Sequence, residues 1–190
     1  MSEIAKPAAD QPAIDAEALR KAEQFIEAEE GASNKLRGAL GIFASATAVV
    51  MSLFHLYTAY AIVPTQVLRP VHVGFVLFLS YLLFPASKRY RHRIMWWDWV
   101  AAFAAVAVIA YILQGGDEIW DRNTSPDNWD IVFGAALILL ILEGMRRASG
   151  WVMPIVVASF VLYALFGEQL PGSWAHRSYE VGRLVGHLYM

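Results

Sequence analysis

The chain has 190 residues, of which 57% are hydrophobic and only 17% are charged, with a formal net charge of −2 and a mean hydropathy of +0.43. Soluble domains contain about 45–50% apolar and about 25% charged residues. The blocks Gly38–Leu68 and Ala148–Gly167 also lack Asp, Glu, Lys and Arg entirely. These features exclude an ordinary soluble domain and predict an all-α integral membrane protein.

Cysteine is absent from the sequence. Disulfides, thiolate metal sites and thiol nucleophiles are therefore excluded, and the net charge gives no indication of nucleic-acid binding. The first 37 residues are polar and acidic and contain no apolar segment followed by a small-residue cleavage site. We therefore expect no cleaved signal peptide, and we expect the first uncharged block to act as the membrane anchor.

Residues 1–35 are predicted to form a cytoplasmic tail that contains one short amphipathic helix. The helix is expected over Ile14–Glu30, with apolar residues such as Leu19 and Phe25 at helical spacing and Gly31 as its end. Its other face is acidic, which matches anionic lipid poorly. This favours a solvated or protein-docking helix over one that binds the membrane surface.

Five apolar segments follow, and each is predicted to cross the membrane. A crossing helix needs about 20 residues, with a range of about 17–25. The first and fifth segments meet this length comfortably, and the second and third are near its lower limit. The fourth is the weakest, because Asp130 and Glu143 bracket its apolar part, and a re-entrant or buried helix is the alternative there. The segments are Gly38–Val63, Leu68–Phe84, Trp97–Leu113, Trp129–Met145 and Ala148–Phe166.

Basic residues are concentrated in alternate loops, and this predicts the orientation. Arg69 and Arg122 are the only Lys or Arg residues in the other two loops, and the second of these loops is crowded with acidic residues. Lys and Arg stay cytoplasmic in short loops. We therefore expect a cytoplasmic N-terminus and a periplasmic C-terminus. The cytoplasmic basic residues would be Lys35, Arg37, Lys88, Arg89, Arg91, Arg93, Arg146 and Arg147.

Ionisable side chains inside a span are functional candidates by default. His55 and His72 are interpreted as structural or interfacial, because neither has a carboxylate in its own segment and no second histidine falls at metal-ligand spacing. Asp98 is expected to cap the helix that begins at the tryptophans around it. Glu143 is expected to form a structural ion pair with the arginines three and four residues later, Arg146 and Arg147.

The sequence contains no HExxH, GxSxG or P-loop motif and no paired carboxylates on one helix face. The prolines Pro64, Pro70, Pro85 and Pro154 lie at or within a turn of a segment end, whereas transporter sites occur where helices are broken in mid-membrane. We therefore expect no catalytic, cofactor, metal or substrate site in this chain. Two alternatives stay open: an autonomous small transporter or channel, which needs a polar mid-membrane path, and an intramembrane enzyme, which needs paired catalytic groups.

Four stretches resemble one family both in amino-acid sequence and in their order along the chain. They include LRPVHVGFVLFLSYLLFP at 68–85, WWDW at 96–99 and LPGSWAHRSYEVGRLVGHLYM at 170–190, and the most specific is the stretch Asp130–Gly167. The chain from Gly38 onward is similar to the amino-terminal part of the fused permeases of tripartite ATP-independent periplasmic (TRAP) transporters, of the TAXI-associated kind.

The resemblance implies a four-helix domain over 36–147, equivalent to the small Q subunit, then a connecting transmembrane helix over 148–167. Residues 168–190 would be the periplasmic start of a large M-like permease domain, which holds the substrate and sodium sites. The chain would then be a fragment, a truncated product or a separately encoded subunit.

Its implied role is a non-catalytic scaffold in ion-gradient-driven uptake of organic acids or related solutes across the bacterial inner membrane. The implied partners are the large permease, a periplasmic solute-binding protein and membrane lipid.

Overall fold

The computed structural model describes residues 15–29, 34, 36–87, 90 and 93–190. Throughout this part of the chain the protein is helical and contains no strand, which confirms the all-α prediction. The predicted helix end at Gly31 and the basic residues Lys35, Lys88, Arg89 and Arg91 lie outside the described residues. The α-helices are α1 (Ala16–Glu29), α2 (Gly38–Tyr60), α3 (Thr65–Leu83), α4 (Trp96–Asp121), α5 (Asn128–Ser149), α6 (Val152–Leu165) and α7 (Val181–Tyr189).

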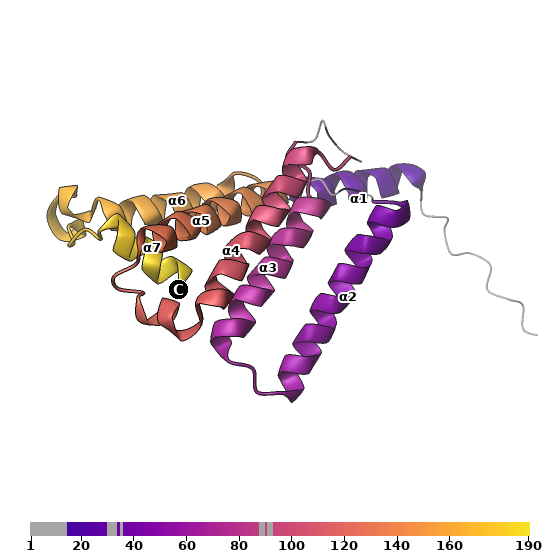
Figure 1. Ribbon diagram of the computed structural model, residues 1–190. Coiled ribbons are helices and arrows are strands. Elements are labelled where there is room, and N and C mark those ends of the chain that lie inside the picture. Colours follow the sequence, from indigo (N-terminus) through magenta and orange to yellow (C-terminus); the bar gives the residue numbers. More distant parts are fainter. Residues whose placement is uncertain (1–14, 30–33, 35, 88–89, 91–92) are drawn as a thin grey trace, which may run out of the picture.

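Three helices, α2, α3 and α4, are long and apolar enough to cross a membrane. The shortest, α3, has 19 residues, and at a rise of 1.5 Å per residue it spans about 28 Å, close to the roughly 30 Å of a hydrocarbon core. Figure 1 shows the three helices side by side, with α3 in the middle. The helix α3 packs extensively on α4 and also contacts α2. These features fit a membrane protein.

The start of α2 is fastened to the end of α3. The backbone N–H of Asn34 donates to the carbonyl of Leu83 at 2.6 Å, and its side-chain amide donates to the carbonyl of Leu82 at 3.1 Å. Asn34 is itself buried. The two helices therefore form an antiparallel pair whose ends are held in register near the N-terminus of α2.

The helix α4 is broken near its end. Gly116 has φ +50°, a left-handed conformation that glycine adopts without steric cost. Beyond this break the chain turns, so that Ile119 is fully buried and Trp120 faces a cavity. The apolar part of α4 therefore ends close to the predicted end of the third segment at Leu113.

The fourth and fifth segments differ from the expectation of two further apolar crossings. The helix α5 has 22 residues, or about 33 Å, but it carries four charged side chains and is not one of the three sufficiently apolar helices. The helix α6 has only 14 residues, or about 21 Å, and is shorter than the predicted Ala148–Phe166. That predicted start is wrong, because Ala148 and Ser149 form the last turn of α5, which ends where Gly150 adopts φ +75°.

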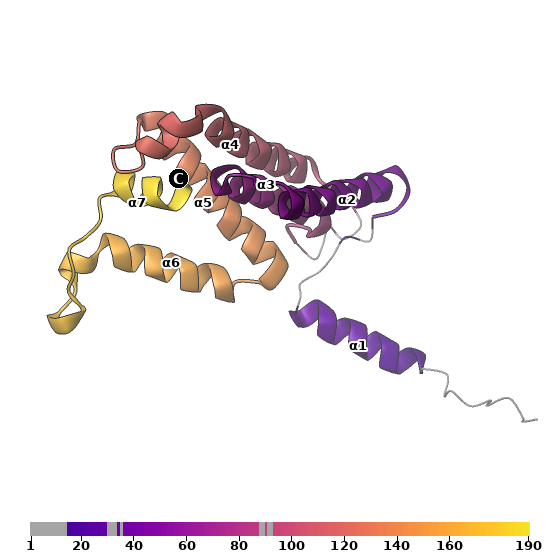
Figure 2. The same cartoon turned by 90° about the horizontal axis from the view of Figure 1, so that it is seen from below.

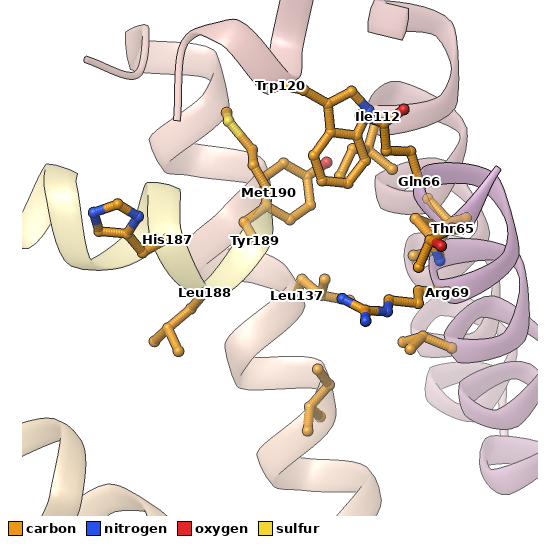
Figure 3. A pocket seen from close by; sticks show the side chains of 14 residues that line it. Thr65, Gln66, Arg69, Ile112, Trp120, Leu137, His187, Leu188, Tyr189 and Met190 are labelled. Carbon is orange, nitrogen blue, oxygen red and sulfur yellow. The ribbon is translucent and has the colours of Figure 1, made fainter. Parts of the chain in front are cut away.

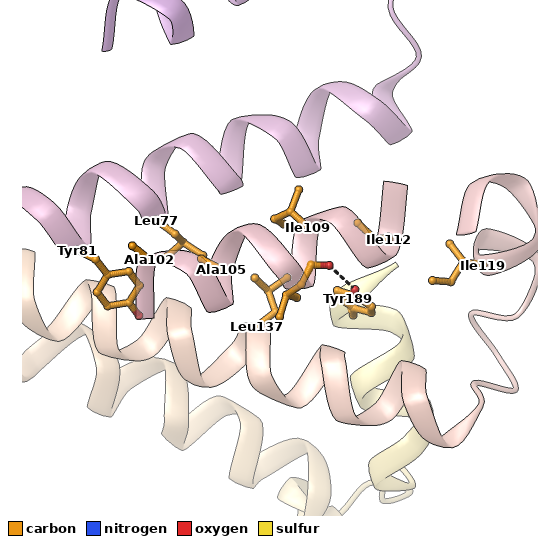
Figure 4. Close-up of a cluster of buried hydrophobic side chains, with 10 residues drawn as sticks. Leu77, Tyr81, Ala102, Ala105, Ile109, Ile112, Ile119, Leu137 and Tyr189 are labelled. Carbon is orange, nitrogen blue, oxygen red and sulfur yellow. Dashed lines mark hydrogen bonds between the residues drawn. The ribbon is translucent and has the colours of Figure 1, made fainter. Parts of the chain in front are cut away.

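The C-terminal helix α7 folds back onto the bundle. It packs on α5, where Gly134 leaves room for Val185 and Tyr189. The hydroxyl of Tyr189 donates to the carbonyl of Val108 at 2.9 Å (Figure 4). Burial raises the pKa of Tyr189, so this hydroxyl keeps its proton. Tyr189 thus belongs to the core, although it lies in the stretch 168–190 that was expected to be the periplasmic start of a large permease domain.

The hydrophobic core lies between α3, α4, α5 and α7, with α5 and α6 inclined to the other long helices (Figures 1 and 2). The predicted acidic helix is present as α1, and Figure 2 shows it set apart from the bundle. The core residues are Leu77, Tyr81, Ala102, Ala105, Val108, Ile109, Ile112, Ile119, Leu137 and Tyr189.

Candidate functional site

Asp98 is a buried carboxylate at the start of α4. The helix begins at Trp96 with Met95 as its N-cap, so Asp98 is the third helical residue and not the cap itself. One carboxylate oxygen, Oδ2, accepts a hydrogen bond from the backbone N–H of Met95 at 2.8 Å. Asp98 therefore satisfies an amide at the end of α4 from inside the first turn, where the helix dipole also favours a negative charge.

The other carboxylate oxygen of Asp98 binds Arg147, near the end of α5. The Arg147 guanidinium donates to Oδ1 of Asp98 at 2.5 Å, and the two side chains are only 4% and 1% exposed. The guanidinium also lies 4.7 Å from the ring centroid of Tyr81 on α3. This single arginine thus joins α3, α4 and α5 at one end of the bundle.

Glu143 binds both of the arginines that follow it. Arg146 donates to the two oxygens of Glu143 at 2.7 and 2.8 Å, and Arg147 donates through Nε to Oε1 at 2.8 Å. Arg146 also donates to the backbone carbonyl of Ala86 at 3.0 Å, just beyond α3. We refer to Asp98, Glu143, Arg146 and Arg147 together as the Asp98 cluster.

The Asp98 cluster holds two carboxylates and two guanidinium groups, so its formal charges balance. Because each carboxylate already accepts bonds from arginine, neither is free to act as a general base or to bind a cation. Among the residues described, no group of three or more His, Asp or Glu side chains could hold a metal ion. The arrangement therefore suits a structural clamp better than a reaction centre.

A second polar cluster lies at the opposite end of α4 and α5. Asp130 is fully buried and accepts a hydrogen bond from the hydroxyl of Tyr111 at 2.7 Å and from the backbone N–H of Asp127 at 2.9 Å. Arg122 binds Asp127 at 2.7 Å and approaches Asp130 at 3.5 Å. From the sequence, Asp130 was expected only to limit the apolar part of the fourth segment. The spacing of Asp127 and Asp130, three residues apart at a helix start, is the capping pattern that could have revealed this role.

The two histidines on neighbouring helices meet. The Nε2 atom of His55 on α2 lies 2.9 Å from Nδ1 of His72 on α3, and Nδ1 of His55 lies 2.7 Å from the carbonyl of Met51. Since a carbonyl only accepts, Nδ1 of His55 carries a proton. In the neutral ring Nε2 then accepts, and Nδ1 of His72 donates to it. The contact between His55 and His72 was not predicted from the sequence, although residues at similar distances from a helix–helix connection face one another in an antiparallel pair.

Arg69, the last of the sequence-selected residues, joins neither cluster. It projects from the first turns of α3 into a cavity of about 430 Å³ between α3, α4, α5 and α7 (Figure 3). The structure therefore brings Asp98, Glu143, Arg146 and Arg147 together, pairs His72 with His55, and leaves Arg69 in a separate place.

No family model, curated protein sequence or solved structure matches the chain.

Proposed function

We propose that the chain is the non-catalytic scaffold part of a TRAP-type secondary transporter, which takes up organic acids or related small solutes using an ion gradient. The observation that carries the proposal is the Asp98 cluster, in which the Asp98–Arg147 pair is buried and which links α3, α4 and α5 to one another. Buried charges paired in this way hold helices in one arrangement, and removing one partner is costly.

The distribution of polar groups supports a scaffold over an autonomous transporter. Both charged clusters lie at helix ends, with Asp98 in the first turn of α4 and Asp130 in the first turn of α5. The described core between them is apolar apart from its two tyrosines, Tyr81 and Tyr189, whose hydroxyls both bind backbone carbonyls. A solute path needs polar groups that are free to exchange partners, and the paired charges described above are not free in this sense.

The apolar surface supports assembly with another membrane-embedded part. The side chains of Ile42, Leu53 and Leu56 on α2 are 72%, 58% and 67% exposed. On α6, Ile155 and Phe160 are 60% and 67% exposed. Such faces are covered by lipid or by other helices in a membrane protein. In the proposed assembly one of them contacts a large M-like permease, which receives solute from a periplasmic binding protein.

The proposed orientation places the Asp98 cluster at the cytoplasmic side of a bacterial inner membrane and the Asp130 cluster at the periplasmic side. The basic Arg146 and Arg147 then lie inside, as the distribution of Lys and Arg in short loops favours. The antiparallel order of α2, α3 and α4 is consistent with this proposal. In the same scheme α5 is a fourth crossing, with its two ends at the two clusters.

Assembly with a large permease tests the proposed function. The tagged chain is coexpressed with an M-like permease and purified in mild detergent, with an unrelated multispanning protein of similar size as the matched control. We expect the chain and the M-like permease to co-elute as a stoichiometric complex, and the control protein to be absent. The proposal would be contradicted if the chain were well folded but none of the M-like permeases tested co-eluted with it.

A further inference from the structure

The cavity that contains Arg69 lies at the end of the bundle where α3 begins. Its walls come from α3, α4, α5 and α7, and its volume of about 430 Å³ falls within the roughly 300–1,000 Å³ typical of small-molecule pockets. The cavity is therefore large enough to hold a small ligand, and it is not part of either charged cluster.

The lining of the cavity changes character along the bundle. Its polar wall on α3 is formed by Thr65, Gln66 and Arg69, in the first turns of the helix. Val73 on α3 and Leu137 on α5 form the apolar wall further from the helix ends. The cavity thus offers a polar end and an apolar end to one ligand.

Arg69 is the one Lys or Arg residue in the lining, and no Asp or Glu lines the cavity. Within the described part of the chain Arg69 makes no ion pair, and the acidic residues of the second polar cluster, Asp127 and Asp130, do not line this cavity. Figure 3 shows its guanidinium reaching from α3 across the cavity toward Leu137. Arg69 is the fifth residue of α3, and its guanidinium, unpaired within the described residues, can donate hydrogen bonds to the oxygens of an external anion.

We infer that this cavity binds a membrane amphiphile with an acidic headgroup, whose phosphate or carboxylate pairs with Arg69 while its acyl chain lies along Val73 and Leu137. Two of the helices that line the cavity, α3 and α4, are long and apolar enough to cross a membrane, so lipid is the ligand expected to have access to it. A single guanidinium matches a single phosphate or carboxylate, and the apolar wall requires a tail. The inference does not depend on the scaffold role and goes beyond it.

The test compares ligands that separate headgroup from tail. The purified, delipidated chain is unfolded thermally in nonionic detergent with phosphatidylglycerol, phosphatidylcholine, oleate or glycerol 3-phosphate added. We expect phosphatidylglycerol to raise the midpoint by about 5–10 °C at about 100 times its dissociation constant. Phosphatidylcholine and glycerol 3-phosphate should raise it little. Native mass spectrometry should show one retained phosphatidylglycerol per chain.

Variants then assign the effect to the cavity. Arg69→Gln should abolish the phosphatidylglycerol shift, and Arg69→Lys should keep part of it. Arg183→Gln is the matched control, because Arg183 is an exposed arginine on α7 that does not line the cavity.

A shift with oleate but not with phosphatidylglycerol would support an acidic amphiphile and identify its source as free fatty acid. Equal shifts with phosphatidylglycerol and phosphatidylcholine would overturn the inference, as would a shift with glycerol 3-phosphate alone or one retained in Arg69→Gln. The lipid panel on the unaltered chain decides the matter even if Arg69→Gln does not fold.

Discussion

Asp98 and Arg147 form a buried ion pair across the interface of α4 and α5, although 49 residues separate them in the sequence. Each residue also makes a second interaction, since Asp98 satisfies the backbone amide of Met95 and Arg147 covers the ring of Tyr81. The pair therefore couples the start of one helix to the end of another and to the side of a third. In the proposed scaffold role, this coupling keeps the three helices in one arrangement while the large permease moves.

Replacing Asp98 by asparagine should strongly destabilise the protein. Asparagine keeps the size and can still accept from Met95, but it leaves the Arg147 charge buried without this partner. We expect a loss of about 3–5 kcal/mol in the free energy of unfolding, measured by denaturant titration in detergent. Asp117→Asn is the control, because Asp117 is exposed at the end of α4, and it should change stability by less than about 0.5 kcal/mol. Equal stability of the two variants would refute the clamp.

Glu143→Gln should cost less than Asp98→Asn. The Glu143 side chain is 36% exposed and so is partly screened by solvent, and Arg147 keeps its bond to Asp98. We expect a loss of about 1 kcal/mol or less, seen as a modest fall in thermal stability or in recovery from detergent. In a complex rebuilt with a large permease, the apparent affinity for solute should be unchanged. A stable Glu143→Gln complex that had lost coupling to the ion gradient would give Glu143 a role in transport.

The proposed orientation can be read from single cysteines, because the natural chain has none. Ser125 and Ser87 are both exposed, Ser125 between α4 and α5 and Ser87 after α3. In intact cells, Ser125→Cys should react with an impermeant maleimide and Ser87→Cys should react only after the membrane is permeabilised. The reverse pattern would invert the proposed topology.

The docking of α7 should depend on the absence of a side chain at Gly134. A Cβ at this position would meet Val185 and Tyr189, so Gly134→Leu should displace α7 from α5. The displacement is measured by the reactivity of a cysteine at position 185. Val185 is only 6% exposed, so Val185→Cys should be protected from maleimide while α7 is docked and should react once α7 is displaced. Leu139→Ala is the control, since Leu139 is 66% exposed on the same helix. Unchanged protection of Val185→Cys in Gly134→Leu would contradict the packing.

The spacing of residues along the sequence predicted the contacts that form within a single helix. The pairing of Glu143 with Arg146 and Arg147 follows from their separations of three and four residues, and the class of the fold follows from the long uncharged blocks. Contacts between helices were not predictable in this way. The partner of Asp98 is 49 residues distant, and His55 and His72 were not recognised as neighbours.

The break at Gly150 explains the largest difference from the expected segments. No charged residue separates Ala148 and Ser149 from the apolar run that follows Gly150, so hydropathy alone placed these two residues in the fifth segment. The positive φ of Gly150 instead ends α5 there and leaves α6 with 14 residues. The folding of α7 onto α5 was likewise hidden, because it depends on the small size of Gly134 in another segment.

Transport by the purified chain alone tests the scaffold account most directly. The chain is reconstituted into proteoliposomes, a sodium gradient is imposed, and uptake is measured for a panel of radiolabelled organic acids against empty vesicles. Because the charged groups of the two clusters are paired with one another and the buried core between the clusters is apolar, we expect uptake no greater than in empty vesicles. Reproducible, saturable uptake by the chain alone would contradict the account.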